Sequence, residues 1–315
     1  MTITITTSNV NGIRAAKRKG IEDWAGKHAP DVWCIQEVRA PQDDVDSIFD
    51  EFGFEYATAG KIEAPANLHA MNEVCRVKGR AGVGLLTDLE VLDKRYGLPG
   101  LSEDVDSGRW IETDVKTPEG YAITVASVYV HAGNTDYPTK MEQKYRFLDT
   151  MLKRMGALRD EAAHGGKQAV LCGDFNIAHT PLDIKNAKAN EKHAGFLPEE
   201  RAYVDKWLDE YEFVDVMRSL AGDIQGPYTW WSQRGRAFDN NVGWRIDYQF
   251  ATPELAETAR GFVIDKAPTY DKRWSDHAPL TITYEVSRIP WDNIRKSTIF
   301  AGRPTPHSMS NYRPH

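Results

Sequence analysis

Polar side chains stand directly after an apolar, strand-like run in the middle of this sequence. Residues 169–172 are apolar and end on Gly173, and Asp174 and Asn176 follow, two residues apart. Because side chains alternate along a strand, residues i and i+2 point the same way, so a carboxylate and an amide are aimed together. Taken alone, this pair is explained equally well by an Asx turn, in which such side chains bond the local backbone.

Polar residues also follow other predicted strands. They are Asn9, Glu37, Tyr129, Asp247, Asp276 and His277. Residues at the ends of neighbouring strands meet on one rim of a sheet, where functional sites are commonly built. Each residue alone has an ordinary structural explanation as part of a turn or a surface pair. Their joint occurrence is what indicates a site.

These residue types fit the hydrolysis of a phosphodiester. Mg²⁺ prefers oxygen ligands, usually one or two carboxylates with water and substrate phosphate, which suits Glu37 and Asp276. Asp174 has the chemistry to activate a water molecule, and His277, held by Asp247, to donate to the phosphoryl oxygens. Neutral donors that would fix the phosphate are Asn9, Asn176 and Tyr129. The full set expected around the metal, with Mn²⁺ as the alternative to Mg²⁺, is Asn9, Glu37, Asp174, Asn176, Asp276 and His277.

The composition is typical of a globular protein with a full core. The chain has 315 residues, of which 41% are hydrophobic, and a formal net charge of -7. This charge argues against a protein that coats nucleic acid, but not against an enzyme that keeps its cations on one face. No stretch approaches the roughly 18 apolar residues that span a bilayer, so we expect no membrane partner. We also expect the protein to be a monomer. Cys34 and Cys172 lie in apolar runs, which predicts buried thiols and a cytoplasmic location.

Strand and helix patterns alternate along the chain. β-branched runs bounded by turn residues predict strands at 2–9, 31–37, 82–87, 109–115, 122–130, 168–173, 246–251 and 280–286. Helical spacing of apolar residues predicts helices at 17–28, 139–163 and 199–210, the second begun by a capping box of Thr139 and Glu142. Residues 61–78 are expected to form a long loop. Together these elements predict a layered α/β domain with two packed sheets inside.

Taken in order, the motifs resemble those of the exonuclease III family of apurinic/apyrimidinic endonucleases, within the endonuclease/exonuclease/phosphatase superfamily. The segments concerned are SNVNGIRA, DVWCIQE, GVGLL, VYVHAG, LCGDFNIAH, HAGF, YTWW, NVGWRIDY and SDHAPL. The resemblance implies that residues 1–287 form a four-layered α/β sandwich, with two packed mixed β-sheets flanked by helices. Residues 288–315 would be a Pro-rich, basic extension. The implied activity is that of an Mg²⁺-dependent DNA repair nuclease, which cuts duplex DNA 5′ to abasic sites and processes damaged 3′ ends.

The resemblance also implies roles for individual residues. Glu37 matches the main metal ligand, Asp174 the residue that activates water, and His277 with Asp247 a hydrogen-bonding unit for the transition state. Asn176 matches the companion of Asp174, and Tyr129 and Asn9 match phosphate contacts. Residues placed against DNA are Asn11, Arg14, Arg80, Asn190, Trp230, Arg234, Trp244, Arg245 and Ile246. Of these, Trp230, Trp244 and Ile246 match a pocket for a flipped-out abasic sugar, whose extrusion costs less because no base must unstack.

The sequence departs from the family pattern at three places. Asn11 stands where many relatives carry an aspartate, and His193 stands where an asparagine is common. Tyr129 is not followed by the usual amide, for which Asn134 is a candidate substitute. His179 has no assigned role, and we expect it to be structural.

Two other functions stay open. One is a related metal phosphoesterase for small or lipid phosphates, against which the NVGWRIDY motif argues. The other is a non-catalytic binding protein on the same fold, against which the complete set of catalytic residues argues.

Overall fold

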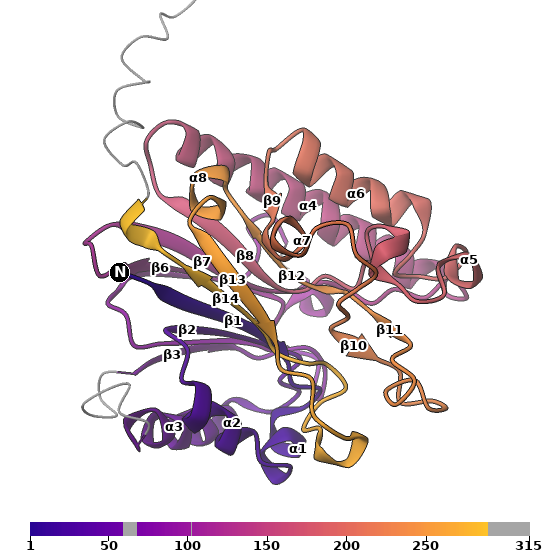
Figure 1. Cartoon of the computed structure of the whole chain (residues 1–315), viewed down its shortest axis with the longest axis horizontal. Coiled ribbons are helices and arrows are strands. Elements are labelled where there is room, and N and C mark those ends of the chain that lie inside the picture. Colours follow the sequence, from indigo (N-terminus) through magenta and orange to yellow (C-terminus); the bar gives the residue numbers. More distant parts are fainter. Residues whose placement is uncertain (59–67, 102, 289–315) are drawn as a thin grey trace, which may run out of the picture.

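The computed structural model of the chain describes residues 1–58, 68–101 and 103–288. Two six-stranded mixed β-sheets pack face to face between outer layers of helices, which confirms the predicted four-layered α/β sandwich (Figure 1). The first sheet has the order β13 (Ala259–Ile264), β14 (Leu280–Tyr284), β1 (Ile3–Asn9), β2 (Val32–Gln36), β4 (Val83–Thr87) and β3 (His69–Glu73). The second has the order β5 (Val91–Tyr96), β6 (Trp110–Lys116), β7 (Ala122–Tyr129), β8 (Gln168–Asp174), β12 (Asp247–Ala251) and β9 (Val214–Asp215).

Helices cover the outer face of each sheet. The first sheet is covered by α1 (Ile13–Arg18), α2 (Ile21–His28) and α3 (Gln42–Thr58), and the second by α4 (Pro138–Ala163) and α6 (Pro198–Asp209) (Figure 1). Shorter elements are α5 (Ala187–Asn190), α7 (Val216–Ala221), α8 (Pro253–Ala256) and a hairpin of β10 (Trp230–Trp231) and β11 (Gly243–Trp244). Within the described ranges, no helix combines the length and the apolar character needed to cross a membrane.

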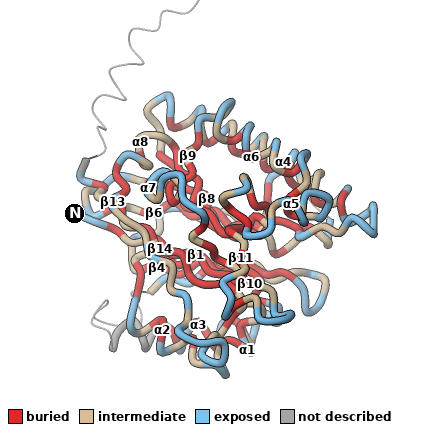
Figure 2. The backbone as a smooth tube through the Cα atoms, turned by 45° about the vertical axis from the view of Figure 1, so that its right-hand side comes forward, coloured by how far each residue is buried: buried red, intermediate tan, exposed pale blue. Residues whose placement is uncertain are grey.

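The core lies between the sheets and beneath the helices, where the backbone is almost continuously buried (Figure 2). Ile5, Leu85, Val125 and Ile282 pack between the two sheets, together with the buried thiol of Cys172. Fully burying one large aliphatic side chain contributes roughly 1.5–3 kcal/mol, so this layer holds the two sheets together. Cys34 is also buried, which confirms the expectation for both thiols.

The strand register brings the polar strand ends to one rim. β1 runs parallel to β2, and β7 runs parallel to β8, with Tyr129 beside Asp174. β12 runs antiparallel to β8 and begins at Asp247, directly opposite Asp174. Because Asn9 ends β1 in the facing sheet, the two sheets together carry polar side chains to the same end of the sandwich.

Several predicted elements differ from the structure. The helix expected at 17–28 is two helices, because Gly20 adopts a left-handed conformation (φ 87°) between them. The capping box of Thr139 and Glu142 is wrong: α4 begins at Pro138, whose fixed φ suits the first helical position, and no side chain caps it. The loop expected at 61–78 contains β3, although its first part lies outside the described residues. The predicted extension 288–315 also lies almost wholly outside them.

Candidate active site at the rim of the two sheets

The amide of Asn9 joins the two sheets at the rim. Its Nδ2 donates to Glu37 Oε2 at 2.8 Å and to Asp174 Oδ2 at 2.9 Å, and the side chain is fully buried. Glu37 follows β2, whereas Asp174 ends β8 of the other sheet. Ser275 Oγ donates to the backbone carbonyl of Asn9 at 2.7 Å, which fixes the segment that carries Asp276 and His277 against the same strand. Residues from four distant parts of the sequence therefore meet here.

Asp174, Asp247 and His277 form a buried cluster. His277 Nδ1 lies 2.8 Å from Asp247 Oδ2, and His277 Nε2 lies 3.8 Å from Asp174 Oδ2. The bond to Asp247 orients the imidazole ring so that Nε2 faces Asp174 and the adjoining cavity. The expected His277–Asp247 unit is thus present in the structure.

Burial and charge set the protonation of this cluster. Burial raises the pKa of Asp174 to about 7, against the opposing charge of His277. Burial alone would lower the pKa of His277, but the charge of Asp247 and its hydrogen bond raise this pKa to about 10. At neutral pH, therefore, His277 carries a proton that it can donate, while Asp174 is close to its pKa and can accept one.

Asn176 takes part both in an Asx turn and in the candidate site, the two interpretations that the sequence left open. Its backbone N–H donates to Asp174 Oδ1 at 2.9 Å, which is an Asx turn. Its side-chain amide donates to the carbonyl of Val130 at 2.9 Å and approaches Asp174 Oδ2 at 3.3 Å. The turn and the site are therefore the same feature, because the turn aims the Asp174 carboxylate.

Left-handed backbone occurs at three of the strand ends. Asn11, Glu37 and Asn176 have φ values of 46°, 59° and 50°. Asparagine tolerates this region, but for glutamate it is strained, and such strain of roughly 1–3 kcal/mol concentrates at functional sites. At Glu37 the conformation directs the carboxylate to the cavity wall, where it pairs with Arg39.

The residues at the rim fit a divalent cation. Glu37, Asp174 and Asp276 line one cavity of about 490 Å³, and within the described chain they are opposed mainly by Arg39 and His277. Asp276 is held by Asn11 Nδ2 at 2.8 Å and Trp230 Nε1 at 3.1 Å. Buried Asp247 Oδ1 has no hydrogen-bond partner among the described residues. Asp174, Asp247 and His277 form a second possible metal group, with ligand atoms within 4.8 Å of one another. Since His277 is already bonded to Asp247, Glu37 and Asp276 are the better pair for the cation.

Comparison with known protein families shows which family this chain belongs to. The model of the Endonuclease/Exonuclease/phosphatase family matches residues 6–277. The chain belongs to this family. It is 30% identical over 279 residues to an exodeoxyribonuclease of Bacillus subtilis (strain 168), covering 88% of this chain and 98% of the relative. It is 32% identical over 281 residues to the DNA repair nuclease APEX1 of Danio rerio, covering 88% and 81%. An AP endonuclease structure from Archaeoglobus fulgidus superposes with a TM-score of 0.73 at 28% identity, covering 90% of this chain and 99% of that one.

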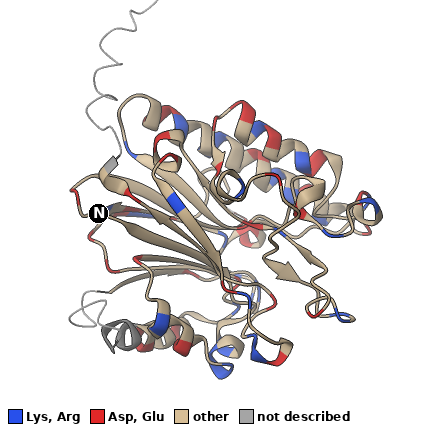
Figure 3. Cartoon of the chain, viewed as in Figure 1, with Lys and Arg blue, Asp and Glu red and all other residues tan. Residues whose placement is uncertain are grey.

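Most residues expected to contact DNA lie at or near the cavity of this family member. Asn11, Asn190, Trp230, Trp244 and Ile246 line it. The rings of the two tryptophans meet edge to face, with centroids 5.9 Å apart. Exposed basic residues, interspersed with acids, lie on α1 and α5 and in the β10–β11 hairpin at the same end of the molecule (Figure 3). They include Arg14, which pairs with Asp44, and Arg234.

Arg245 was expected to contact DNA, and this prediction is wrong. Its side chain is 0% exposed and bonds Asp183 and Asp215, with Nε to Asp183 Oδ1 and Nη2 to Asp215 Oδ2 both at 2.7 Å. The physical reason is alternation: Trp244 and Ile246 face the cavity, so the residue between them faces the interior.

The Asp183–Arg245 pair makes stability depend on pH. Burial opposes ionisation, but the charge of Arg245 lowers the pKa of Asp183 to about 2. An unfolded aspartate titrates near 3.9, so this stabilisation, roughly 2.5 kcal/mol, is complete above that pH and is lost as the pH falls towards 2. We expect Asp183→Asn to destabilise the protein at pH 7, with a stability difference from wild type that shrinks by roughly half at pH 3. Urea unfolding at both pH values measures it, and an unchanged difference would contradict the assignment.

Two features of the site were missed from the sequence. Arg109 Cζ lies 4.9 Å from the centroid of the buried Tyr129 ring and lines an adjoining cavity of about 330 Å³ with Arg39, Arg80 and Lys140. Burial raises the pKa of Tyr129 well above its ordinary value, so its hydroxyl stays a donor.

The second missed feature is a buried ion pair beneath the site. Lys144 Nζ lies 2.5 Å from Glu200 Oε1, and both side chains are 0% exposed. The same Nζ donates to the carbonyls of Ala132 at 3.1 Å and Asn176 at 2.9 Å. Glu200 Oε2 accepts the backbone N–H of Gly195 at 2.6 Å. The pair therefore ties together three loops that form the cavity wall.

Two remaining residues have local partners. Asn134 Oδ1 accepts the backbone N–H of Asp136 at 2.9 Å, which holds a turn, and the cavity wall after Tyr129 is formed by Ala132 and Gly133. That Asn134 replaces the amide missing after Tyr129 stays a prediction. His179 Nε2 lies 2.7 Å from Asp205 Oδ1, in keeping with the structural role expected for it.

Proposed function

We propose that this chain is a divalent-metal-dependent DNA repair nuclease that hydrolyses the phosphodiester 5′ to an abasic site in duplex DNA and processes damaged 3′ ends. The observation that carries the proposal is the buried cluster of Asp174, Asp247 and His277, in which His277 Nε2 lies 3.8 Å from Asp174 Oδ2, at the wall of a cavity lined by two tryptophans. The names of the exodeoxyribonuclease and AP endonuclease relatives support a DNA substrate.

Each group at the rim has a role in this reaction. Asp174 accepts a proton from the attacking water, while His277 and the Tyr129 hydroxyl donate hydrogen bonds to the phosphoryl oxygens. When bound at Glu37 and Asp276, a cation such as Mg²⁺ or Mn²⁺ would neutralise phosphate charge and stabilise the leaving oxygen. Trp230 and Trp244 offer apolar surface to a sugar that lacks a base.

The proposal is tested with a duplex that carries one tetrahydrofuran abasic analogue. We expect incision with Mg²⁺ and none with EDTA, and an intact duplex of the same sequence should not be cut internally. Parallel reactions use a recessed 3′ end and inositol phosphates. Hydrolysis of inositol phosphates without incision would favour the rival small-phosphate or lipid-phosphate esterase. DNA binding without hydrolysis of any of these substrates would favour a non-catalytic protein.

The metal requirement should depend on Glu37. We expect Glu37→Ala to raise the Mg²⁺ concentration for half-maximal incision by roughly tenfold or more, because an oxygen ligand is lost and Arg39 is left without its partner. The measurement is a Mg²⁺ titration of the incision rate. Glu90→Ala, which removes an exposed carboxylate paired with Lys116 on the distant β5–β6 side, is the matched control. An equal Mg²⁺ requirement in both variants would contradict the assignment.

The monomeric state and the cytoplasmic location stay predictions. Size-exclusion chromatography with light scattering tests the first, and a fluorescent fusion in the source cell tests the second. The buried thiols of Cys34 and Cys172 support a reducing compartment.

A further inference from the structure

The guanidinium of Arg273 forms no ion pair with an acidic group of the described chain. Its Cζ lies 3.9 Å from the centroid of the Tyr270 ring and 5.0 Å from that of Phe238. The guanidinium makes no hydrogen bond or ion pair with any residue in the described ranges, and its Nη1 is buried. The two rings therefore hold a cation in place without neutralising it.

Four other partly buried arginines pair with carboxylates, whereas Arg109 and Arg201 bond backbone carbonyls. Arg95 and Arg154 pair with Glu112, Arg146 pairs with Asp106, and Arg218 pairs with Asp183. Desolvating a charged group is costly unless a counterion and hydrogen bonds replace the lost water. A partly buried guanidinium with no acidic partner is therefore suited to an anion that comes from outside the chain.

The position of Arg273 shows which anion can reach it. Arg273 lines a hollow of about 240 Å³ together with Lys19 and Asp271, and Asn11 and Asp276 line both this hollow and the active-site cavity. The hollow is therefore a groove that continues from the catalytic carboxylates towards α1. A polymer whose phosphates repeat along the chain can occupy both places at once.

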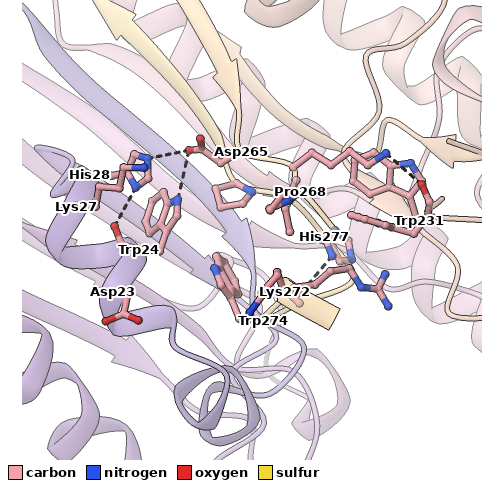
Figure 4. Close-up of a pocket in the computed structure, with 17 residues that line it drawn as sticks. Asp23, Trp24, Lys27, His28, Trp231, Asp265, Pro268, Lys272, Trp274 and His277 are labelled. Atoms are coloured by element: carbon pink, nitrogen blue, oxygen red, sulfur yellow. Dashed lines mark hydrogen bonds and ion pairs between the residues drawn. The ribbon is translucent and has the colours of Figure 1, made fainter. Parts of the chain in front are cut away.

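Arg273 also lines a second cavity, on the opposite side of the same segment. There Lys272 and Trp274 border a cavity of about 430 Å³, with Trp24 and His28 of α2 across from them (Figure 4). The carboxylate of Asp265 reaches into this cavity and bonds Trp24 Nε1 at 3.3 Å. The groove beside Asp276 is the favoured place for a phosphate of the bound strand, because it shares Asn11 and Asp276 with the active-site cavity.

We propose that Arg273, with Lys19 across the groove, binds a backbone phosphate of the DNA strand outside the scissile phosphodiester. This inference rests on the proposed function. The planar guanidinium can bond two phosphate oxygens, and stacking on Tyr270 lowers the entropy lost on binding. Arg273 is then a DNA-binding residue that fixes the register of the strand at Asp174.

The test compares DNA affinity at several salt concentrations. The probe is the tetrahydrofuran duplex in EDTA, and binding is measured by fluorescence anisotropy. We expect Arg273→Ala to weaken binding roughly tenfold and to reduce the slope of log affinity against log salt by about one. Arg260→Ala, which removes an arginine paired with Glu285 at the far edge of the first sheet, should leave both unchanged. Arg273→Lys should keep the slope of log affinity against log salt but lose part of the affinity. The charge remains, but an ammonium group lacks the planar geometry with which a guanidinium bonds two phosphate oxygens.

A second measurement locates the phosphate. Single methylphosphonate substitutions remove one backbone charge at a time, and at one position the substitution should weaken binding by wild type but not by Arg273→Ala. The inference is overturned if Arg273→Ala matches Arg260→Ala in affinity and slope, or if every substitution affects both proteins equally. If wild type incises the duplex but Arg273→Ala binds normally, this inference alone fails. If wild type neither binds nor incises it, the proposed function fails as well.

Discussion

Asp174→Asn is expected to lower the rate of abasic-site incision by roughly three orders of magnitude while changing DNA affinity by less than about threefold. Asparagine keeps the size of the side chain and one oxygen for the amide of Asn9, but it cannot accept a proton from water. Single-turnover incision and anisotropy measure the two quantities separately. Asp205→Asn, at an exposed carboxylate that bonds His179, is the control.

The pH profile gives this prediction a second readout. The base must be deprotonated to act, and the pKa of Asp174 is about 7, so the wild-type rate should fall as the pH drops below that value. A variant that lacks the base should not show this fall in rate at acidic pH. If Asp174→Asn kept near-full activity, or kept the same fall in rate, another group would be the base.

Lys144→Met is expected to destabilise the protein by roughly 3–5 kcal/mol, the cost of leaving one partner of a buried ion pair without the other. Glu200 would lose its ion-pair partner in a fully buried position, and the carbonyls of Ala132 and Asn176 would lose their donor. Urea unfolding followed by circular dichroism measures the change. Lys153→Met, on the exposed face of the same helix, should change stability by less than about 0.5 kcal/mol.

A double variant separates the charge effect from simple loss of packing. Lys144→Met with Glu200→Gln removes both charges and leaves an amide oxygen to accept the N–H of Gly195, so part of the stability should return. If the double variant were no more stable than Lys144→Met, or if Lys144→Met cost less than about 1 kcal/mol, the pair would not hold the loops as described.

The layout of the site was predictable because it follows from strand ends. Asp174, Asp247 and Tyr129 each stand at the boundary of an apolar run, and the sheet register alone brings them together. The helix α3 also carried a visible signal that was missed, since Val45, Ile48, Phe49 and Phe52 recur at helical spacing and are buried.

Other features depend on tertiary contacts that a pattern does not contain. β5 lies at a sheet edge and exposes Leu92 and Tyr96, so its apolar residues do not mark a core face. Lys144 and Glu200 are 56 residues apart on different helices, and both charges are ordinary at helix positions. Arg245 shows the opposite case: strand alternation already placed it away from Trp244 and Ile246, but the match to a DNA-binding motif outweighed that signal.

The position of the cut made by the wild-type protein distinguishes an abasic-site nuclease from the rival functions. The substrate is a 5′-labelled duplex with one tetrahydrofuran site, incubated with Mg²⁺, and the labelled product is then offered to a DNA polymerase. We expect a single cut immediately 5′ to the analogue that leaves a 3′-hydroxyl which the polymerase extends, and no product with EDTA. A cut at another position, a product that is not extended, or no Mg²⁺-dependent cut would contradict it.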